Sequence, residues 1–595
     1  MQWYAGVVSA YVYARAAELP LTPGHGDRNR VVRFIVQQHA GMPDFLRWPM
    51  VALTLGFDLF GLFLFLRPFC GQSVAQRSAQ ISCWKESPLG PFRDFVRFYD
   101  SLFTVAWSDP HLLPMLTPAS TQPKPVTKVR IQKPDAIVVG SGPGGAITGA
   151  LLAEAGLRVV MLEEGPGIGE AATHAFTVQE MVAKYRNGGL TPAMGSPKVA
   201  YVEGKCAGGG SEINSGLYHR TPAAMLRHWQ QHYNLAISEA DLTPHYAECE
   251  RAVSVSYLPE GTAPAASLKL QSGADAMGWH CQEVPRWFTN GERQSMSRTF
   301  LKRFLSAGGE LLSRTRCTSV ERASGRWAVE TEGTDFTLAA PHLFLSGGAI
   351  GTPALLQRSR LGSARGTAFG QNLQMHPTIK VVALFDEEVN SESMGVPVHQ
   401  VKEFAPDISM GCAISSESYL AMAMLDHPRE LHRVRTDWRR MAIYYAMIVP
   451  EGRGAVRTLP GCRDPLVTFK CTNPDLYLLS TALKRLCRLL FAAGAVRLYP
   501  TIAGCPAIGG VEDLRKLPAC LPAERSNLMT IHLMSSCAAG ENAALCPIDS
   551  LGRVVGQSGL YVADGSLLPS APGVNPQGSI MAFSHRNATA FLQST

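Results

Sequence analysis

DAIVVGSGPGGAITGALLAEAGLRVVMLEEG, residues 135–165, is the stretch that decides the fold of this 595-residue chain. A short β-branched run at 136–139 precedes three glycines with G-x-G-x-x-G spacing, Gly140, Gly142 and Gly145. An Ala- and Leu-rich segment follows, and a second apolar run at 159–162 ends in Glu163. Short apolar runs are typical of buried parallel strands, and the segment between them has a helical composition. The stretch therefore predicts a strand, a turn, a helix and a second strand.

Each part of this unit has a physical task at a dinucleotide. Gly140 permits the tight turn, Gly142 lets the backbone approach a pyrophosphate, and Gly145 lets helix and strand pack closely. The N-terminus of the helix presents free N–H groups and a partial positive charge to the phosphates. Glu163 can accept hydrogen bonds from a ribose diol. Because the strand, the helix, the second strand and the acidic residue follow one another at the expected spacing, we predict a dinucleotide site rather than an ordinary glycine-rich turn.

Length and composition restrict the class of protein. A chain of 595 residues is too long for one core, so we expect two or three domains. The net charge of +7 is mild at this length and the basic residues form no long run, so no nucleic-acid partner is expected. The 14 cysteines include no C-x-x-C pair and no zinc-like spacing. We therefore expect reduced thiols in a cytoplasmic protein and no metal site.

Residues 1–130 are expected to form an appended helical region that ends in a linker rich in Pro, Thr and Lys. Within it, residues 48–66 form a 19-residue stretch whose only charge is Asp58. This length just spans a bilayer, but a carboxylate near its middle would cost a few kcal/mol there. We therefore favour a buried or surface-inserted helix. A peripheral membrane contact through residues 48–66 is the open alternative.

Two further glycine-rich stretches follow the first unit. Residues 206–222 read CAGGGSEINSGLYHRTP, and on this stretch alone a flexible turn and a ligand contact are equally good interpretations. Residues 342–362, HLFLSGGAIGTPALLQRSRLG, predict a second strand, turn and helix, with Pro353 in the first turn of the helix. Between these stretches, residues 300–312 predict a basic amphipathic helix.

The C-terminal half contains a second domain and a closing block. Residues 378–524 alternate strand-like and helical runs, as in a sheet-based domain. In the closing block an apolar strand at 560–563 ends in Asp564. Pro576 begins a C-terminal helix, and Asn575 stands where the N-cap of that helix would be.

Four motifs in a fixed order make residues 135–590 resemble the glucose-methanol-choline (GMC) flavoprotein oxidoreductases. They are the opening fingerprint, GGGSEIN with a following RTP, GAIGTPALLQRSRLG, and a closing block with GLYVADGSLLP and GVNP. The H-x-x-S-S-C that starts at His532 is similar to the long-chain alcohol oxidase branch and its bacterial relatives. Arg360, where the family usually has Gly, and Glu212, inside the glycine-rich motif, depart from the pattern.

The resemblance implies an α/β architecture with two interleaved domains. A Rossmann-like FAD-binding domain is expected from residues 131–225, 301–377 and 525–595. An α+β sheet-based substrate domain is expected from residues 226–300 and 378–524. The FAD is expected to bind non-covalently, because Tyr201 stands where a few relatives tether the flavin through a histidine.

The resemblance also assigns site residues. His532, which by itself reads as a structural imidazole, aligns with the family's active-site histidine. Asn575 aligns with the second active-site residue, which is His or Asn among members. The positions that fall on flavin contacts are Gly208, Gly209, Ser211, Asn214, Asp564 and Pro576.

The chemistry of these residues suits the oxidation of an alcohol. An imidazole such as that of His532 can take the hydroxyl proton while hydride leaves for flavin N5, and Asn575 can hold the substrate oxygen. We therefore predict an FAD-dependent oxidoreductase that converts an alcohol to a carbonyl compound, with an apolar or long-chain substrate favoured. The electron acceptor is left open between O₂, a quinone and a protein carrier. The alternatives are a lyase or light-driven fatty-acid decarboxylase, and a flavin-binding protein without catalysis.

Overall fold

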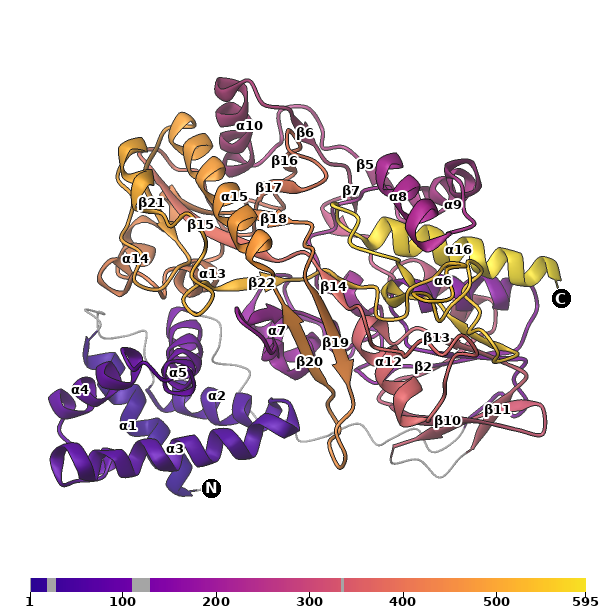
Figure 1. Cartoon of the computed structure of the whole chain (residues 1–595), viewed down its shortest axis with the longest axis horizontal. Coiled ribbons are helices and arrows are strands. Elements are labelled where there is room, and N and C mark those ends of the chain that lie inside the picture. The colour runs from indigo at the N-terminus through magenta and orange to yellow at the C-terminus, as the bar shows by residue number, and fades with distance from the viewer. Residues whose placement is uncertain (1, 19–27, 110–128, 333–336, 595) are drawn as a thin grey trace.

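The chain forms an N-terminal group of helices beside a body that is built on two large sheets (Figure 1). The structure is a computed structural model, and it describes residues 2–18, 28–109, 129–332 and 337–594. Most of the predicted Pro/Thr/Lys linker lies outside the described residues. The predicted fold class, a Rossmann-like domain with a second sheet domain and an appended helical region, is confirmed.

Five helices make up the N-terminal region: α1 (Gln2–Glu18), α2 (Arg28–Gly41), α3 (Asp44–Phe65), α4 (Val74–Lys85) and α5 (Gly90–Ser108). Their common core is aromatic. Phe57 of α3 lies 4.7 Å from Trp84 and 4.8 Å from Phe95 between ring centroids, and Phe92 stacks on Trp84 at 4.0 Å. Such pairs contribute beyond the area they bury, so this core holds the five helices together.

Helix α3 covers residues 48–66 almost completely and is packed on one side only. Its inner face buries Thr54, Phe57 and Asp58, and the Asp58 carboxylate accepts hydrogen bonds from Trp3 Nε1 (3.0 Å) and Cys70 N (3.1 Å). Its outer face exposes large apolar side chains: Trp48 (80%), Leu55, Leu59, Leu62 and Phe63 (81%). Among the described residues, α3 is the one helix that is long and apolar enough to cross a membrane.

The first sheet has five parallel strands, and they come from distant parts of the chain. Their spatial order is β24 (Leu560–Val562), β13 (His342–Leu345), β1 (Ala136–Val139), β2 (Val159–Leu162) and β9 (Glu310–Leu312). The helices that pack around this sheet are α6 (Pro143–Glu154), α11 (Phe300–Ser306), α12 (Gly348–Arg358) and α16 (Gln577–Ser594). The predicted strand–turn–helix–strand unit is thus the centre of the sheet, with β1 in the middle.

Two local predictions at this sheet were wrong. The helix predicted over 300–312 ends at Ser306, because Gly308 and Gly309 interrupt it, and the segment continues as strand β9. Pro353 lies in the second turn of α12 rather than the first. A proline there leaves the carbonyl of Ala349 without its helical donor, and the hydroxyl of Ser536 donates to that carbonyl instead (2.6 Å).

The second sheet has nine strands. Eight of them lie in the order β3 (Thr191–Ala193), β4 (Val199–Tyr201), β22 (Leu528–Thr530), β15 (Thr378–Phe385), β18 (Met441–Ile448), β17 (Ile408–Cys412), β16 (His399–Val401) and β6 (Cys281–Glu283). The ninth, β21 (Ala495–Pro500), pairs with β15. Helices α10 (Ala265–Met277) and α15 (Asn473–Ala492) cover one face with an apolar core.

Smaller elements complete the body. The remaining helices are α7 (Val178–Lys184), α8 (Ala223–Tyr233), α9 (Glu239–Ala252), α13 (Glu417–Ala423) and α14 (Arg433–Asp437). The remaining strands are β5 (Val255–Ser256), β7 (Arg286–Thr289), β8 (Glu292–Arg293), β10 (Cys317–Ala323), β11 (Arg326–Thr331), β12 (Leu338–Ala340), β14 (Gln374–Met375), β19 (Arg453–Arg457), β20 (Leu466–Lys470) and β23 (Leu533–Met534).

Candidate active site

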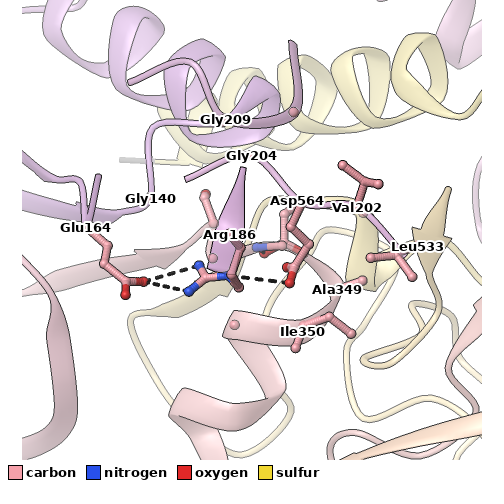
Figure 2. A pocket seen from close by; sticks show the side chains of 18 of the residues that line it. Gly140, Glu164, Arg186, Val202, Gly204, Gly209, Ala349, Ile350, Leu533 and Asp564 are labelled. Atoms are coloured by element: carbon pink, nitrogen blue, oxygen red, sulfur yellow. Dashed lines mark hydrogen bonds and ion pairs between the residues drawn. The ribbon is translucent and has the colours of Figure 1, made fainter. Parts of the chain in front are cut away.

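A long cavity lies at the carboxyl ends of β1, β2 and β13, where parallel α/β sheets bind their ligands. Figure 2 shows it with Gly140 and Gly209 on one side and Ala349 and Ile350 on the other. The predicted site residues that line it are Gly140, Gly142, Glu163, Gly209, Asn214, His532, Asp564, Asn575 and Pro576. Gly145, Gly208 and Ser211 are not among its lining residues.

Three of the predicted glycines, Gly140, Gly145 and Gly209, lie where a side chain would collide with the backbone. A Cβ on Gly140, whose φ is +103°, would lie 2.2 Å from the carbonyl oxygen of Ser346. A Cβ on Gly145 would lie 2.0 Å from the oxygen of Gly140, and one on Gly209 would lie 2.8 Å from Cα of Gly142. The turn after β1 and the second glycine-rich stretch are therefore in direct backbone contact and form one wall of the cavity.

Gly208 and Ser211 hold this wall from behind. The amide N–H of Gly208 donates to Oγ of Ser141 (3.2 Å). The hydroxyl of Ser211 is buried, donates to the oxygen of Gly208 (2.7 Å) and accepts from the N–H of Met296 (3.0 Å). Ser211 therefore shapes the glycine-rich stretch from outside the cavity.

Glu163 ends β2 beside the first turn. Its carboxylate accepts hydrogen bonds from the N–H (3.2 Å) and hydroxyl (2.5 Å) of Ser141 and from the N–H of Gly165 (2.7 Å). Burial raises the pKa of Glu163. A carboxylate has about four lone-pair sites, so one remains for a further donor on the cavity side.

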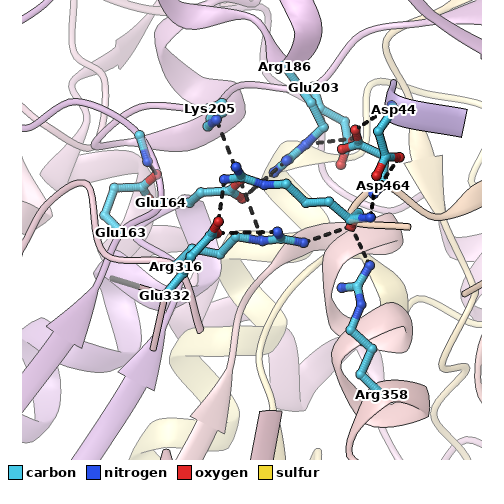
Figure 3. Close-up of polar contacts among 12 residues, drawn as sticks. Asp44, Glu163, Glu164, Arg186, Glu203, Lys205, Arg316, Glu332, Arg358 and Asp464 are labelled. Atoms are coloured by element: carbon cyan, nitrogen blue, oxygen red, sulfur yellow. Dashed lines mark hydrogen bonds and ion pairs between the residues drawn. The ribbon is translucent and has the colours of Figure 1, made fainter. Parts of the chain in front are cut away.

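Glu164, the next residue, is the centre of a charged cluster that sequence reasoning missed (Figure 3). Its carboxylate forms ion pairs with Arg186 (3.1 Å), Lys205 (3.5 Å) and Arg316 (3.7 Å). Burial alone would raise the pKa of Glu164, but these cations hold it well below its usual range. The cations come from separate segments of the chain, so no local sequence pattern announces the cluster.

Asp564 ties the end of β24 to the beginning of α12. Its carboxylate accepts from the N–H of Gly348 (2.9 Å), the hydroxyl of Thr352 (2.5 Å), and the N–H (2.8 Å) and hydroxyl (2.5 Å) of Ser566. Burial raises its pKa. The residue therefore positions two turns of the cavity wall in addition to lining the cavity.

Asn214 joins the glycine-rich stretch to the C-terminal helix. Its side-chain amide donates to Oε1 of Gln577 (2.6 Å), and its Oδ1 accepts from the N–H of Gly216 (3.0 Å). The carbonyl of Pro576 accepts the first helical bond, from Ile580 N (3.0 Å), so Pro576 and not Asn575 occupies the cap position of α16. The predicted N-cap role of Asn575 was wrong, because its side chain turns toward His532.

His532 and Asn575 meet at one end of the cavity. Nδ2 of Asn575 lies 3.3 Å from Nε2 of His532, and Oδ1 of Asn575 accepts from Nε2 of Gln400 (3.2 Å). His532 follows β22, and Asn575 precedes α16. Only the packing of these two elements brings the pair together.

His376 lies behind His532 and was not singled out as a site residue. Nδ1 of His376 lies 3.0 Å from Nδ1 of His532, and Nε2 of His376 accepts from the N–H of Gly573 (3.1 Å). That backbone bond assigns the proton of neutral His376 to Nδ1, which donates to His532. The neutral ring of His532 then carries its own proton on Nε2, where it opposes the donor Nδ2 of Asn575, so the two contacts of His532 favour different tautomers.

Burial, with the nearby Lys402 cation as a second cause, lowers the pKa of His532 to about 4. The ring is therefore neutral at physiological pH. Burial lowers the pKa of His376 as well, and the charge of His532 adds to this effect. The pair is a neutral hydrogen-bonded unit with one nitrogen directed at the cavity.

Models of known protein families match most of the body. Two models described as GMC oxidoreductase match residues 181–378 and 450–584, and one described as NAD(P)-binding Rossmann-like domain matches residues 138–197. An uncharacterized GMC-type oxidoreductase of Sinorhizobium fredii is 38% identical over 483 residues, which cover 77% of this chain and 94% of the relative. A long-chain-alcohol oxidase of Arabidopsis thaliana is 25% identical, over 77% of this chain and 67% of the relative.

Solved structures share the fold. Pyridoxine 4-oxidase from Mesorbium loti superposes with a TM-score of 0.59 at 17% identity, over 77% of this chain and 99% of that one. A formate oxidase variant from Aspergillus oryzae gives the same TM-score at 15% identity, over 78% and 99% of the two chains. At sequence identities this low, the structural similarity establishes the fold of the body and nothing about its activity.

Proposed function

Because this chain belongs to the GMC oxidoreductase family, we propose that it oxidises an alcohol to a carbonyl compound with non-covalently bound FAD. The observation that carries the proposal is the arrangement of one continuous cavity. His532 and Asn575 lie at its reactive end, and the glycine turn and Glu163 also line it. A dinucleotide cofactor needs such an extended site.

The residues present fit FAD, which GMC oxidoreductases bind. Gly140 and Gly209 have no room for a Cβ and Gly142 touches Gly209, so bare backbone forms this wall, where a pyrophosphate would approach. The first-turn N–H groups of α6 have no intrahelical acceptor and favour an anion. Glu163 keeps a lone-pair site for a ribose hydroxyl. When bound, FAD supplies the acceptor for the hydride of the substrate.

His532 is the proposed base. Its neutral ring can accept the hydroxyl proton of the alcohol at Nε2, provided that its own proton then sits on Nδ1. The contact with the donor Nδ2 of Asn575 favours this tautomer, and it requires His376 to move its own proton from Nδ1 to Nε2, away from the bond with Gly573. Asn575 holds the substrate oxygen next to the ring, which orients the carbinol C–H.

Non-covalent attachment is proposed because Tyr201 stands in the place of the tethering histidine of a few relatives. Tyr201 ends β4 and lines the cavity. After acid precipitation of the holoprotein, the flavin is therefore expected in the supernatant. Flavin that stays with the polypeptide would contradict this part of the proposal.

The proposed substrate class is an apolar or long-chain alcohol, in line with the similarity to long-chain-alcohol oxidases. The test is an anaerobic visible spectrum of the holoprotein with a panel of alcohols. Flavin bands that bleach with one class support the oxidation and name the class. If dithionite bleaches the flavin bands and no alcohol bleaches them, the result favours the lyase, decarboxylase or non-catalytic alternatives. A protein that takes up no flavin overturns the proposal.

We also propose that α3 rests on a membrane surface rather than across a membrane. Its outward face is apolar from Trp48 to Leu66, because Asp58 is turned inward and hydrogen-bonded. Arg47 and Arg67 stand at the two ends of this stretch, as basic residues do in interfacial helices on anionic lipid. A spanning position would require α3 to leave the core that encloses Phe57 and Asp58.

A further inference from the structure

The nine-stranded sheet is polar where it faces the active site. On one of its faces Ile379, Met410 and Ala446 enter the apolar core under α10 and α15. The alternate residues point to the opposite face, since side chains alternate along a strand. This second face carries polar side chains on or directly after four adjacent strands: Lys380, Gln400, Lys402, Ser409 and Tyr445.

Hydrogen bonds connect this polar face to the active site. Gln400 donates to the hydroxyl of Tyr445 (3.1 Å) and to Oδ1 of Asn575 (3.2 Å). Lys402 lies two residues further along the same face, and its Nζ donates to Oγ of Ser409 (2.8 Å). The charge of Lys402 also reaches His532, where it is the second cause of the lowered pKa.

Two cations on this face have no acidic partner. Among the described residues, no carboxylate lies within ion-pair distance of Lys402 or Lys380, and no hydrogen bond of the Lys380 ammonium group is formed. Burial is the sole cause that lowers the pKa of each lysine to about 8. Both side chains are partly buried, and a charge that loses part of its hydration without an acidic partner costs free energy.

Neighbouring polar atoms are unpaired as well. His219 is 9% exposed, and neither of its ring nitrogens has a hydrogen-bond partner in the described structure. Its carbonyl packs against Gly578 in the first turn of α16, where a Cβ would lie 2.1 Å from the His219 oxygen, and the charges of Lys402 and His532 add to the burial that lowers its pKa. Oε1 of Gln400 is also buried without a partner. Buried polar atoms without a partner require an explanation, and a bound ligand supplies one.

We propose that Lys402, with a ring N–H of His219, binds an anionic group of the alcohol substrate, while Gln400, whose amide N–H groups bond Tyr445 and Asn575, holds Asn575 in place. The inference rests on the proposed function and deepens it, because it assigns the substrate a charged end next to the reacting carbon or at the end of a chain. A long-chain alcohol that terminates in an acid would satisfy this site and the apolar preference together. A lysine is a point charge and accepts carboxylate or phosphate, so the shared chemistry is the negative charge.

The test uses the flavin spectrum of the holoprotein as a binding signal that needs no turnover. Octanoate, octyl phosphate and octanol are titrated into the wild type, Lys402→Met, Lys402→Arg and Lys302→Met. Lys302 is an exposed lysine of α11 and serves as the matched control. We expect the two anions to bind the wild type more tightly than octanol, and Lys402→Met to weaken them by about tenfold or more. Lys402→Arg should restore most of the affinity, and Lys302→Met should change nothing.

The outcomes separate this inference from the proposed function. Equal affinity for octanoate and octanol in the wild type, or unchanged anion affinity in Lys402→Met, overturns the inference. A preference between octanoate and octyl phosphate names the anionic group. FAD content and the unfolding midpoint check that each variant folds, and Lys402→Gln is a second neutral variant. If no alcohol reduces the flavin, the proposed oxidation fails, while the anion titration still decides the role of Lys402.

Discussion

The N-terminal helical region and the nine-stranded sheet depart from ordinary burial in opposite directions. The helical region exposes apolar side chains on α3 and at its C-cap, with Phe63 81% and Leu66 88% exposed. The sheet partly buries Lys380 and Lys402 with no acid from the described residues to pair with them, and the charge of Lys402 reaches His532. An exposed apolar surface and a partly buried cation without an acid are both informative, because each costs the isolated fold free energy.

This difference in burial indicates which kind of partner each region can bind. In α3 the only acid, Asp58, is hydrogen-bonded inside the bundle, so the outer face can bind through apolar area alone. The sheet carries Lys402 without an acid and the unpaired polar atoms of His219 and Gln400, so binding there depends on charge and hydrogen bonds. Variants in one region should therefore leave the property of the other unchanged.

The largest effect is expected from His532→Ala. Loss of the base should slow flavin reduction by the best alcohol by about 10² or more, while FAD stays bound, because the ring contacts Asn575 and His376 rather than the glycine turn. Stopped-flow absorbance under anaerobic conditions measures the rate. His585→Ala is the matched control, since His585 on α16 pairs with His245 and does not line the cavity. Equal rates in parent and His532→Ala would remove His532 from the base role.

A smaller effect is expected on the N-terminal side. The double substitution Trp48→Ser and Phe63→Ser should lower binding to anionic phospholipid vesicles by about tenfold, because two exposed rings no longer enter the interface. Vesicle co-sedimentation of the holoprotein measures it, and Tyr257→Ser, an exposed ring outside α3, is the control. Oxidation of a short water-soluble alcohol should not change. Vesicle binding that is absent in the parent, or unaltered in the variant, would contradict the membrane proposal.

The smallest effect is expected from pH. The pKa of His532 is lowered to about 4, so the ring stays neutral between pH 6 and 8, and the flavin reduction rate should change by less than about twofold there. The rate should fall as pH drops through about 4, where the ring gains its proton. Lys402→Met should move this midpoint upward, because the lysine charge disfavours the protonated ring. A midpoint near 6.5 in the parent would contradict the assigned burial.

Local sequence chemistry predicted the centre of the fold well and its margins less well. The unit from β1 to β2 was predictable, because glycine spacing and apolar runs act within about 30 residues. The segment at 300–312 was misread, because its helical pattern outweighed the Gly308–Gly309 break that begins an edge strand. The partner of the Ala349 carbonyl, Ser536, lies too far along the chain for any local pattern to indicate it.

The candidate site divides in the same way. His532, Asn575 and Glu163 were named from motifs, whose order along the chain is a sequence property. His376 was seen only as part of a turn, and its role depends on the 3.0 Å contact with His532. No sequence pattern indicated Lys402, because a lysine next to a predicted strand is normally solvent-exposed and only the structure shows its neighbours.

The sequence by itself determined the dinucleotide unit, the family motifs and the apolar character of residues 48–66, since these depend on residue types at short spacing. Only the tertiary structure decided that Asp58 faces inward and that Lys402 is partly buried without an acid. The physical reason is that burial and pairing are set by strand register and helix packing between segments far apart in the chain. The protonation state and the binding role of a charged side chain depend on those neighbours.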